Sequence, residues 1–119
     1  MRQYMLLIQH GGMPAPGSPE WAGLSADEQK AIYAGYKAID ETAGVTPGQW
    51  LEHPGLATTV RGQDGKTLTT DGPFVAAKEA LNGYLFFEAE DLDAAIELAS
   101  RVPVVRYGGA VEVRPIKES

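Results

Sequence analysis

Two segments of this 119-residue chain are apolar on both faces of a strand, and this feature limits the folds that the chain can adopt. Residues 2–9 (RQYMLLIQ) place three apolar side chains on one face and two on the other, and residues 84–89 (YLFFEA) are similarly apolar. Successive side chains of a strand point to opposite faces of a sheet. Both strands therefore need cover on two sides.

Two amphipathic helices are predicted, and they provide only part of this cover. The first helix begins at Ser25, which forms a capping box with Glu28. Gly35 lies inside it, where a glycine either weakens the helix or lets a neighbouring element approach closely. The stripe that we expect to be buried consists of Ile32, Tyr36, Ile39 and Ala43.

The second helix is predicted to begin at Asp91, a favourable N-cap residue, and to end before Pro103. A turn at 108–109 and a strand at 110–114 (AVEVR) follow it, with the valines pointing inward. The stripe of this helix that we expect to be buried consists of Leu92, Ala95, Ile96 and Ala99.

The middle of the chain is predicted to form a hairpin. Strands at 56–61 (LATTVR) and 67–70 flank Asp64-Gly65, which supplies the positive φ that tight hairpin turns need. Residues 45–55 form a connection, with a short strand expected at 49–52. The order is strand, helix, hairpin, strand, helix, strand, which predicts one α+β domain: a ferredoxin-like antiparallel sheet with two helices on one face.

Two helices on one face leave the other face of this sheet bare. A bare apolar sheet face is an interaction surface, so we expect a homodimer joined through this face. The alternative is that the Pro- and Gly-rich loop at 11–23 folds under the sheet. Trp21 in this loop is interpreted as an anchor packed on the body, with a place on a pocket rim as the alternative.

Composition and charge exclude several classes of protein. The net charge of −6, with only 10 scattered basic residues, argues against nucleic-acid binding. The absence of cysteine excludes disulfides, thiol catalysis and thiolate metal sites. No apolar run is long enough to span a bilayer, and residues 1–8 are interpreted as a strand and not as a signal peptide. We therefore expect a cytoplasmic protein that does not bind membranes.

The most unusual local chemistry lies in the stretch Thr70-Asp71-Gly72-Pro73-Phe74. Its structural interpretation is a turn in which Asp71 bonds to nearby backbone N–H groups and Phe74 is buried as an anchor. Its functional interpretation is that Asp71 presents a carboxylate at a strand end, as a general acid or base in a pocket. We retain Asp71 as the candidate catalytic residue.

Four other polar residues are candidate substrate contacts: Arg61, Lys78, Glu79 and Tyr107. Each has an equally simple explanation as a surface residue or as part of a solvated ion pair. A metal site formed by His10 and His53 would need both to converge with a carboxylate, so no metal is predicted. Phosphate-binding and dinucleotide-binding motifs are absent from the sequence, and no cofactor is predicted.

The ordered set of short motifs resembles the YCII-related family, in its DGPF-type branch, along nearly the whole chain. The motifs are residues 4–8 (YMLLI), 57–61 (ATTVR), 70–74 (TDGPF), 78–79 (KE), 82–84 (NGY), 106–108 (RYG) and 111–115 (VEVRP). The resemblance implies a dimeric α+β barrel. Many members of this branch are uncharacterised and occur beside extracytoplasmic-type sigma factors.

The resemblance does not supply a catalytic pair. Relatives in the wider family carry a histidine on the first helix and an aspartate just before a proline after the second helix, which are proposed to form an acid/base dyad. This sequence has Tyr33 near the first position and Val102 before Pro103 at the second. Three hypotheses remain: a small-molecule enzyme that uses Asp71, a non-catalytic ligand-binding or regulatory module associated with transcription, and a purely structural dimer.

Overall fold

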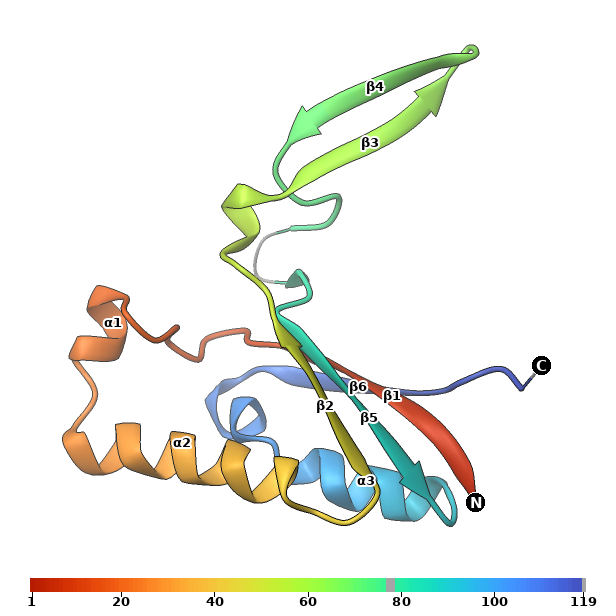
Figure 1. Cartoon of the computed structure of the whole chain (residues 1–119). Coiled ribbons are helices and arrows are strands. Elements are labelled where there is room, and N and C mark those ends of the chain that lie inside the picture. Colours follow the sequence, from red (N-terminus) through yellow and green to blue (C-terminus); the bar gives the residue numbers. More distant parts are fainter. Residues whose placement is uncertain (77–78, 119) are drawn as a thin grey trace.

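The computed structural model describes residues 1–76 and 79–118 and shows an α+β domain (Figure 1). Four strands form an antiparallel sheet in the order β2-β5-β1-β6, and helices α2 and α3 lie on one of its faces. This arrangement confirms the predicted ferredoxin-like fold. The strands of the sheet are β1 (Arg2–Gln9), β2 (Val45–Trp50), β5 (Gly83–Ala89) and β6 (Ala110–Pro115). The helices are α1 (Pro19–Ala22), α2 (Ala26–Asp40) and α3 (Leu92–Ser100), with short 3-10 turns η1 (Pro54–Leu56) and η3 (Pro103–Tyr107).

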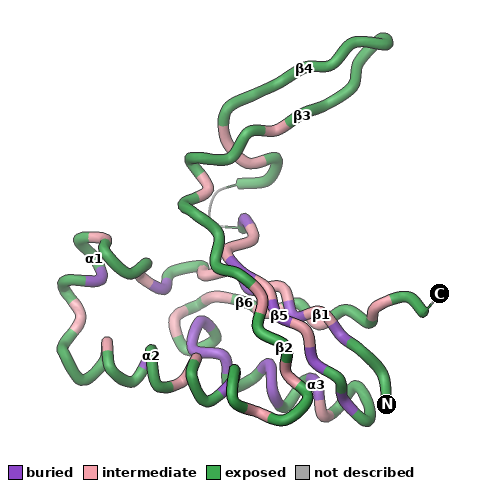
Figure 2. The backbone as a smooth tube through the Cα atoms, viewed as in Figure 1, coloured by how far each residue is buried: buried purple, intermediate pink, exposed green. Residues whose placement is uncertain are grey.

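The core lies between this sheet and the two long helices (Figure 2). β1 buries Tyr4, Leu6 and Ile8, as its alternating pattern predicts. Both helix starts are capped as predicted: the Ser25 hydroxyl accepts from the Glu28 N–H, and the Asp91 carboxylate accepts from the Ala94 N–H. None of the described helices is long and apolar enough to cross a membrane.

A glycine sets how closely α2 approaches the segment after α3. A Cβ atom at Gly35 would lie 2.9 Å from Cγ of Pro103, a fully buried residue. This distance is shorter than real side chains tolerate, so only glycine fits without a shift of the proline ring. Gly35 therefore serves close packing, the second of the two explanations that the sequence offers for it.

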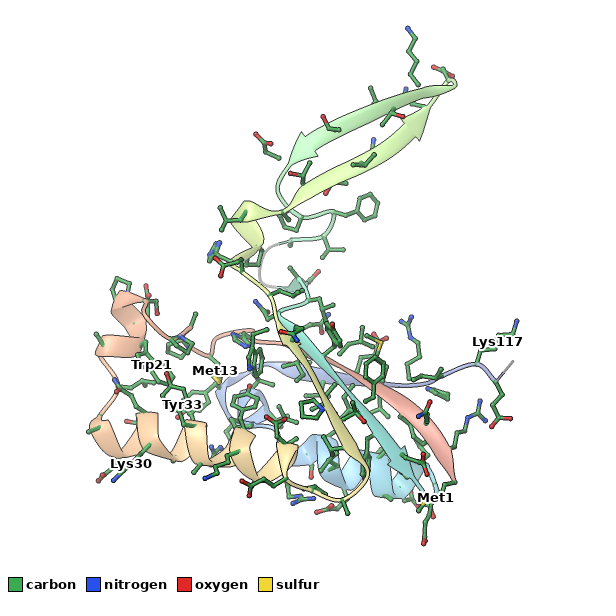
Figure 3. The ribbon with its side chains drawn as sticks, in the orientation of Figure 1. Met1, Met13, Trp21, Lys30, Tyr33 and Lys117 are labelled. Atoms are coloured by element: carbon green, nitrogen blue, oxygen red, sulfur yellow. The ribbon has the colours of Figure 1, made fainter. Side chains whose placement is uncertain are left out.

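The second face of the sheet carries four half-buried apolar side chains: Met5, Leu7, Tyr84 and Phe86. The 11–23 loop does not cover them, because Trp21 is buried in the core and its ring packs edge-on against Tyr33 of α2, at 5.4 Å between centroids (Figure 3). The interpretation of Trp21 as an anchor is thus confirmed. Folding of this loop under the sheet is not observed.

The edge strand β2 was only partly predicted. It spans Val45–Trp50, not 49–52, and it contains Pro47 opposite Leu85 of β5. Its register shifts between Pro47 and Trp50, and Gly48 lies so close to the Tyr84 carbonyl that a Cβ atom would clash with it. Proline and glycine hide this strand in the sequence, but an edge position tolerates both.

The predicted buried stripe of α3 is wrong at two positions. Leu92 and Ile96 are exposed, whereas Leu98 is completely buried together with Ala95 and Ala99. A helix this short and apolar offers more than one possible stripe, and its rotation is set by contact with β5 and β6.

The predicted hairpin forms, but it is not part of the main sheet. It consists of β3 (Thr58–Gln63) and β4 (Lys66–Asp71), which pair only with each other. At its turn Asp64 and Gly65 have φ angles of 51° and 74°, as expected for a tight hairpin turn. Figure 1 shows this hairpin extending well beyond the sheet and helices.

Candidate functional site

A cavity of about 380 Å³ lies where β1 ends, beside the loop that follows it. The Gly-rich turn after β1, the Pro-rich segment after it and the start of η1 form its walls, because the chain leaves the sheet at this point. Its lining residues are His10, Gly11, Gly12, Met13, Pro14, Ala15, Ser18, Glu20, His53, Pro54 and Asn82.

His10 is the lining residue with the most unusual environment. Its backbone N–H donates to the Asn82 side-chain oxygen at 2.9 Å, and its ring packs against Trp50 at 5.6 Å between centroids. Burial lowers the pKa of the imidazole, so the neutral form is favoured. Its Nε2 atom is buried and has no hydrogen-bond partner among residues 1–76 and 79–118.

Tyr36 contacts the same tryptophan from helix α2. Its ring packs edge-on against Trp50 at 4.7 Å between centroids, and burial raises the pKa of its hydroxyl. Within the described part of the chain this hydroxyl also has no hydrogen-bond partner and no access to solvent. We refer to His10, Tyr36 and Trp50 as the aromatic trio. The trio contains a neutral imidazole, which can accept a hydrogen bond, and a protonated phenol, which can donate one.

The two histidines lie at one cavity without forming a metal site. His53 lines the same cavity as His10, together with Glu20. However, Nδ1 of His53 accepts a hydrogen bond from the Gly55 N–H at 2.9 Å, which caps η1. No group of three His, Asp or Glu side chains in residues 1–76 and 79–118 is placed to hold a metal ion.

A second, apolar cavity of about 400 Å³ lies at the base of the hairpin. Pro73 and Phe74 of the 70–74 stretch contribute to its lining. Phe74 is nevertheless 73% exposed, so the prediction that it is a buried anchor is wrong. Its ring lies 6.0 Å from the Arg61 guanidinium carbon, a contact across the face of the hairpin.

The residues proposed from the sequence as a site are spread over several elements. Asp71 ends β4 opposite Thr58 and is exposed, and Glu79 is exposed with its backbone carbonyl accepting from the Gln9 side chain. The Tyr107 hydroxyl lies 3.5 Å from a carboxylate oxygen of Glu28. Neither cavity is lined by any of these residues or by Arg61. Lys78 lies outside the described residues, and a catalytic role for Asp71 stays a prediction.

Comparison with known proteins decides the family. The model of the YCII-related domain matches residues 17–119. An uncharacterised protein of Rhizobium meliloti (strain 1021) is 32% identical over 94 residues, which cover 78% of this chain and 69% of the relative. The chain belongs to the YCII-related family.

In this YCII-related chain the residues in and beside the cavity differ from those that the sequence singled out. Tyr36 fits the apolar stripe of a helix, Trp50 lies in a segment that reads as a connection, and Asn82 belongs to an Asn-Gly turn signal. One signal was available: His10 directly follows a strand, and strand ends are common places for functional side chains. The convergence of these residues depends on the path of β2, which local pattern does not reveal.

Proposed function

We propose that this YCII-related domain binds a small organic molecule in the cavity beside the aromatic trio, and that His10 accepts a hydrogen bond from it. The observation that carries this proposal is Nε2 of the cavity-lining His10, a buried atom with no hydrogen-bond partner among residues 1–76 and 79–118. The hydroxyl of Tyr36, on the other side of Trp50, is buried in the same way and also lacks a partner in that part of the chain. A buried polar group without a hydrogen-bond partner lowers the stability of the folded protein unless a ligand or an ordered water bonds to it.

The chemistry of the walls indicates the class of ligand. Met13, Pro14 and Ala15 offer apolar surface, and His10 and Asn82 offer hydrogen-bonding groups. A cavity of about 380 Å³ lies within the range of small-molecule pockets. A compact, mostly apolar molecule that carries a hydroxyl group fits this set, because neutral His10 can accept a hydrogen bond from that hydroxyl.

Ligand-observed NMR with neutral phenols and short alcohols tests this proposal. His10→Gln removes the imidazole that accepts from the ligand, so it is expected to weaken binding about tenfold. Tyr36→Phe removes a hydroxyl that does not line the cavity, and little effect is expected. Tyr84→Phe is the matched control, since it removes a hydroxyl from the opposite face of the sheet. Binding that His10→Gln leaves unchanged would contradict the proposal. A non-catalytic module is the alternative to an enzyme, and it predicts the same binding without chemical conversion of the bound molecule.

We also propose that the chain forms a homodimer through the helix-free face of the sheet. Met5, Leu7, Tyr84 and Phe86 are cross-strand neighbours there, so they form one apolar patch. Light scattering is expected to give a dimer at micromolar concentration, and Phe86→Glu is expected to give a monomer. Monomeric wild-type protein would refute this part. We further propose that the chain belongs to the DGPF-type branch of the family, which residues 70–74 (TDGPF) support.

A further inference from the structure

The side chains of the β3–β4 hairpin pack against almost nothing else in the described part of the chain. Every residue of β4 is exposed, and β3 contributes only one half-buried side chain, Thr59. Apolar side chains stand in solvent along it, with Val60 63% exposed and Leu68 41% exposed. A two-stranded hairpin without further packing is at best marginally stable in water. The many β-branched residues favour the strands but bury nothing.

The overall dimensions show that one copy is not a compact unit. The radius of gyration is 16.2 Å, whereas a compact domain of this length has about 13.5 Å. The exposed surface is 7941 Å², whereas a compact monomer of this mass exposes about 6,200 Å². The excess is more than the roughly 800 Å² that each partner contributes to a standard interface. The excess is therefore large enough to supply one copy's share of a standard interface with a second copy.

The two faces of the hairpin differ in chemistry. Directly paired residues share a face, so Arg61 and Leu68 lie together, and Lys66 lies on the same side next to Gln63. The opposite face carries Val60 and Asp71 among threonines and a glycine. Each face thus carries one apolar side chain, but the Arg61–Leu68 face has two positive charges and no acidic group, whereas the opposite face has no positive charge and carries Asp71.

The charge of the rest of the chain complements the basic face. Within residues 58–71, Arg61 and Lys66 are balanced by Asp64 and Asp71, so the whole net charge of −6 lies outside the hairpin. A positively charged face is attracted to a body of net negative charge, and the rest of every copy of this chain carries that charge.

We infer that the β3–β4 hairpin is an arm whose Arg61–Leu68 face packs on the acidic body of a second copy of the chain. This rests on the self-association proposed above, and it adds a contact that the sheet face does not provide. In a two-fold dimer each copy gives its arm and receives one, so every such contact occurs twice.

Two charge variants with the same change in net charge test the arm by sedimentation equilibrium. Arg61→Glu reverses a charge on the packed face and is expected to weaken the dimer about tenfold or more. Thr67→Glu with Thr69→Glu adds two negative charges to the opposite face, and we expect less than about a threefold effect. If the wild type is a dimer and the two variants weaken it equally, the inferred arm contact is wrong, whereas the dimer itself is confirmed. A wild type that is monomeric at all concentrations would overturn both.

Hydrogen exchange of the unaltered protein provides a second measurement that does not depend on any variant folding. Backbone amides of residues 58–71 are expected to exchange more slowly at concentrations where the protein is dimeric than where it is monomeric. Exchange at the same rate in both conditions would overturn the inference.

Discussion

The four-stranded sheet and the β3–β4 hairpin are both antiparallel and both form from short sequence signals, yet only the sheet has a core. β1 and β5 alternate apolar side chains on two faces, so they bury one face under helices and leave the side chains of the other half-buried. β3 and β4 are rich in threonine, and almost nothing along them is buried. The comparison teaches that strand pairing follows local pattern, whereas placement in a core follows the amount of apolar surface.

Matched leucine substitutions test this contrast most strongly. Leu98→Ala removes a completely buried side chain of α3 and is expected to cost about 3 kcal/mol of unfolding free energy. Leu68→Ala in the hairpin is expected to cost less than about 0.5 kcal/mol in dilute, monomeric protein. Urea denaturation measures both. Similar costs would show that the hairpin shares the core of the body.

Matched glycine substitutions are expected to have opposite signs. Gly35→Ala forces a Cβ atom against the buried Pro103 ring, so overpacking should outweigh the better helix propensity and destabilise the protein by about 1 kcal/mol. Gly62→Ala meets nothing closer than 3.9 Å, and it should stabilise the hairpin by about 0.5 kcal/mol through the unfolded state. Melting temperatures report the sign directly; a gain at Gly35 would contradict the close packing of α2 on η3.

His10 makes the stability of the body depend on pH. Its pKa is lower in the folded protein than the ordinary 6.5, because burial disfavours the imidazolium. The unfolded chain therefore binds more protons in mildly acidic solution, and stability should fall as pH decreases from about 6.5 through the lower pKa of the folded state. Denaturation curves of wild type and His10→Gln across this range should diverge, with the variant showing the shallower dependence. Parallel curves would mean that His10 is not buried in solution.

The smallest effect is expected at Asp71, which is exposed at the end of the hairpin. Asp71→Asn should change the unfolding free energy by less than about 0.5 kcal/mol. It should also leave small-molecule binding beside His10 unchanged, because Asp71 does not line that cavity. A loss of binding in this variant, seen by ligand-observed NMR, would restore Asp71 to the site and support the catalytic role predicted from the sequence.

Local signals in the sequence predicted the elements that depend on neighbouring residues alone. The alternation in β1, the caps at Ser25 and Asp91, and the Asp64-Gly65 turn were all recognisable, and together they gave the fold class. Features set by distant contacts were missed. The rotation of α3 is decided by the sheet beneath it, and the strand that contains Pro47 exists because β5 lies beside it.

The candidate site was missed for the same reason. His10, Tyr36 and Trp50 come from a strand end, a helix and the edge strand, and no spacing in the chain links them. Asp71 drew attention because its neighbours are unusual in sequence. Its position shows that a conspicuous motif can serve the turn that ends a hairpin.

The base of the hairpin is closed by two hydrogen bonds. The Gly72 N–H donates to the Ala57 carbonyl at 2.7 Å, and the Thr59 hydroxyl donates to the Gly72 carbonyl at 2.7 Å. The chain therefore enters and leaves the hairpin at nearly the same point. Residues beyond these two hydrogen bonds can be lengthened, shortened or exchanged, by evolution or by protein engineering, while the path of the body stays fixed. The hairpin is therefore a place where related chains can diversify without refolding their core.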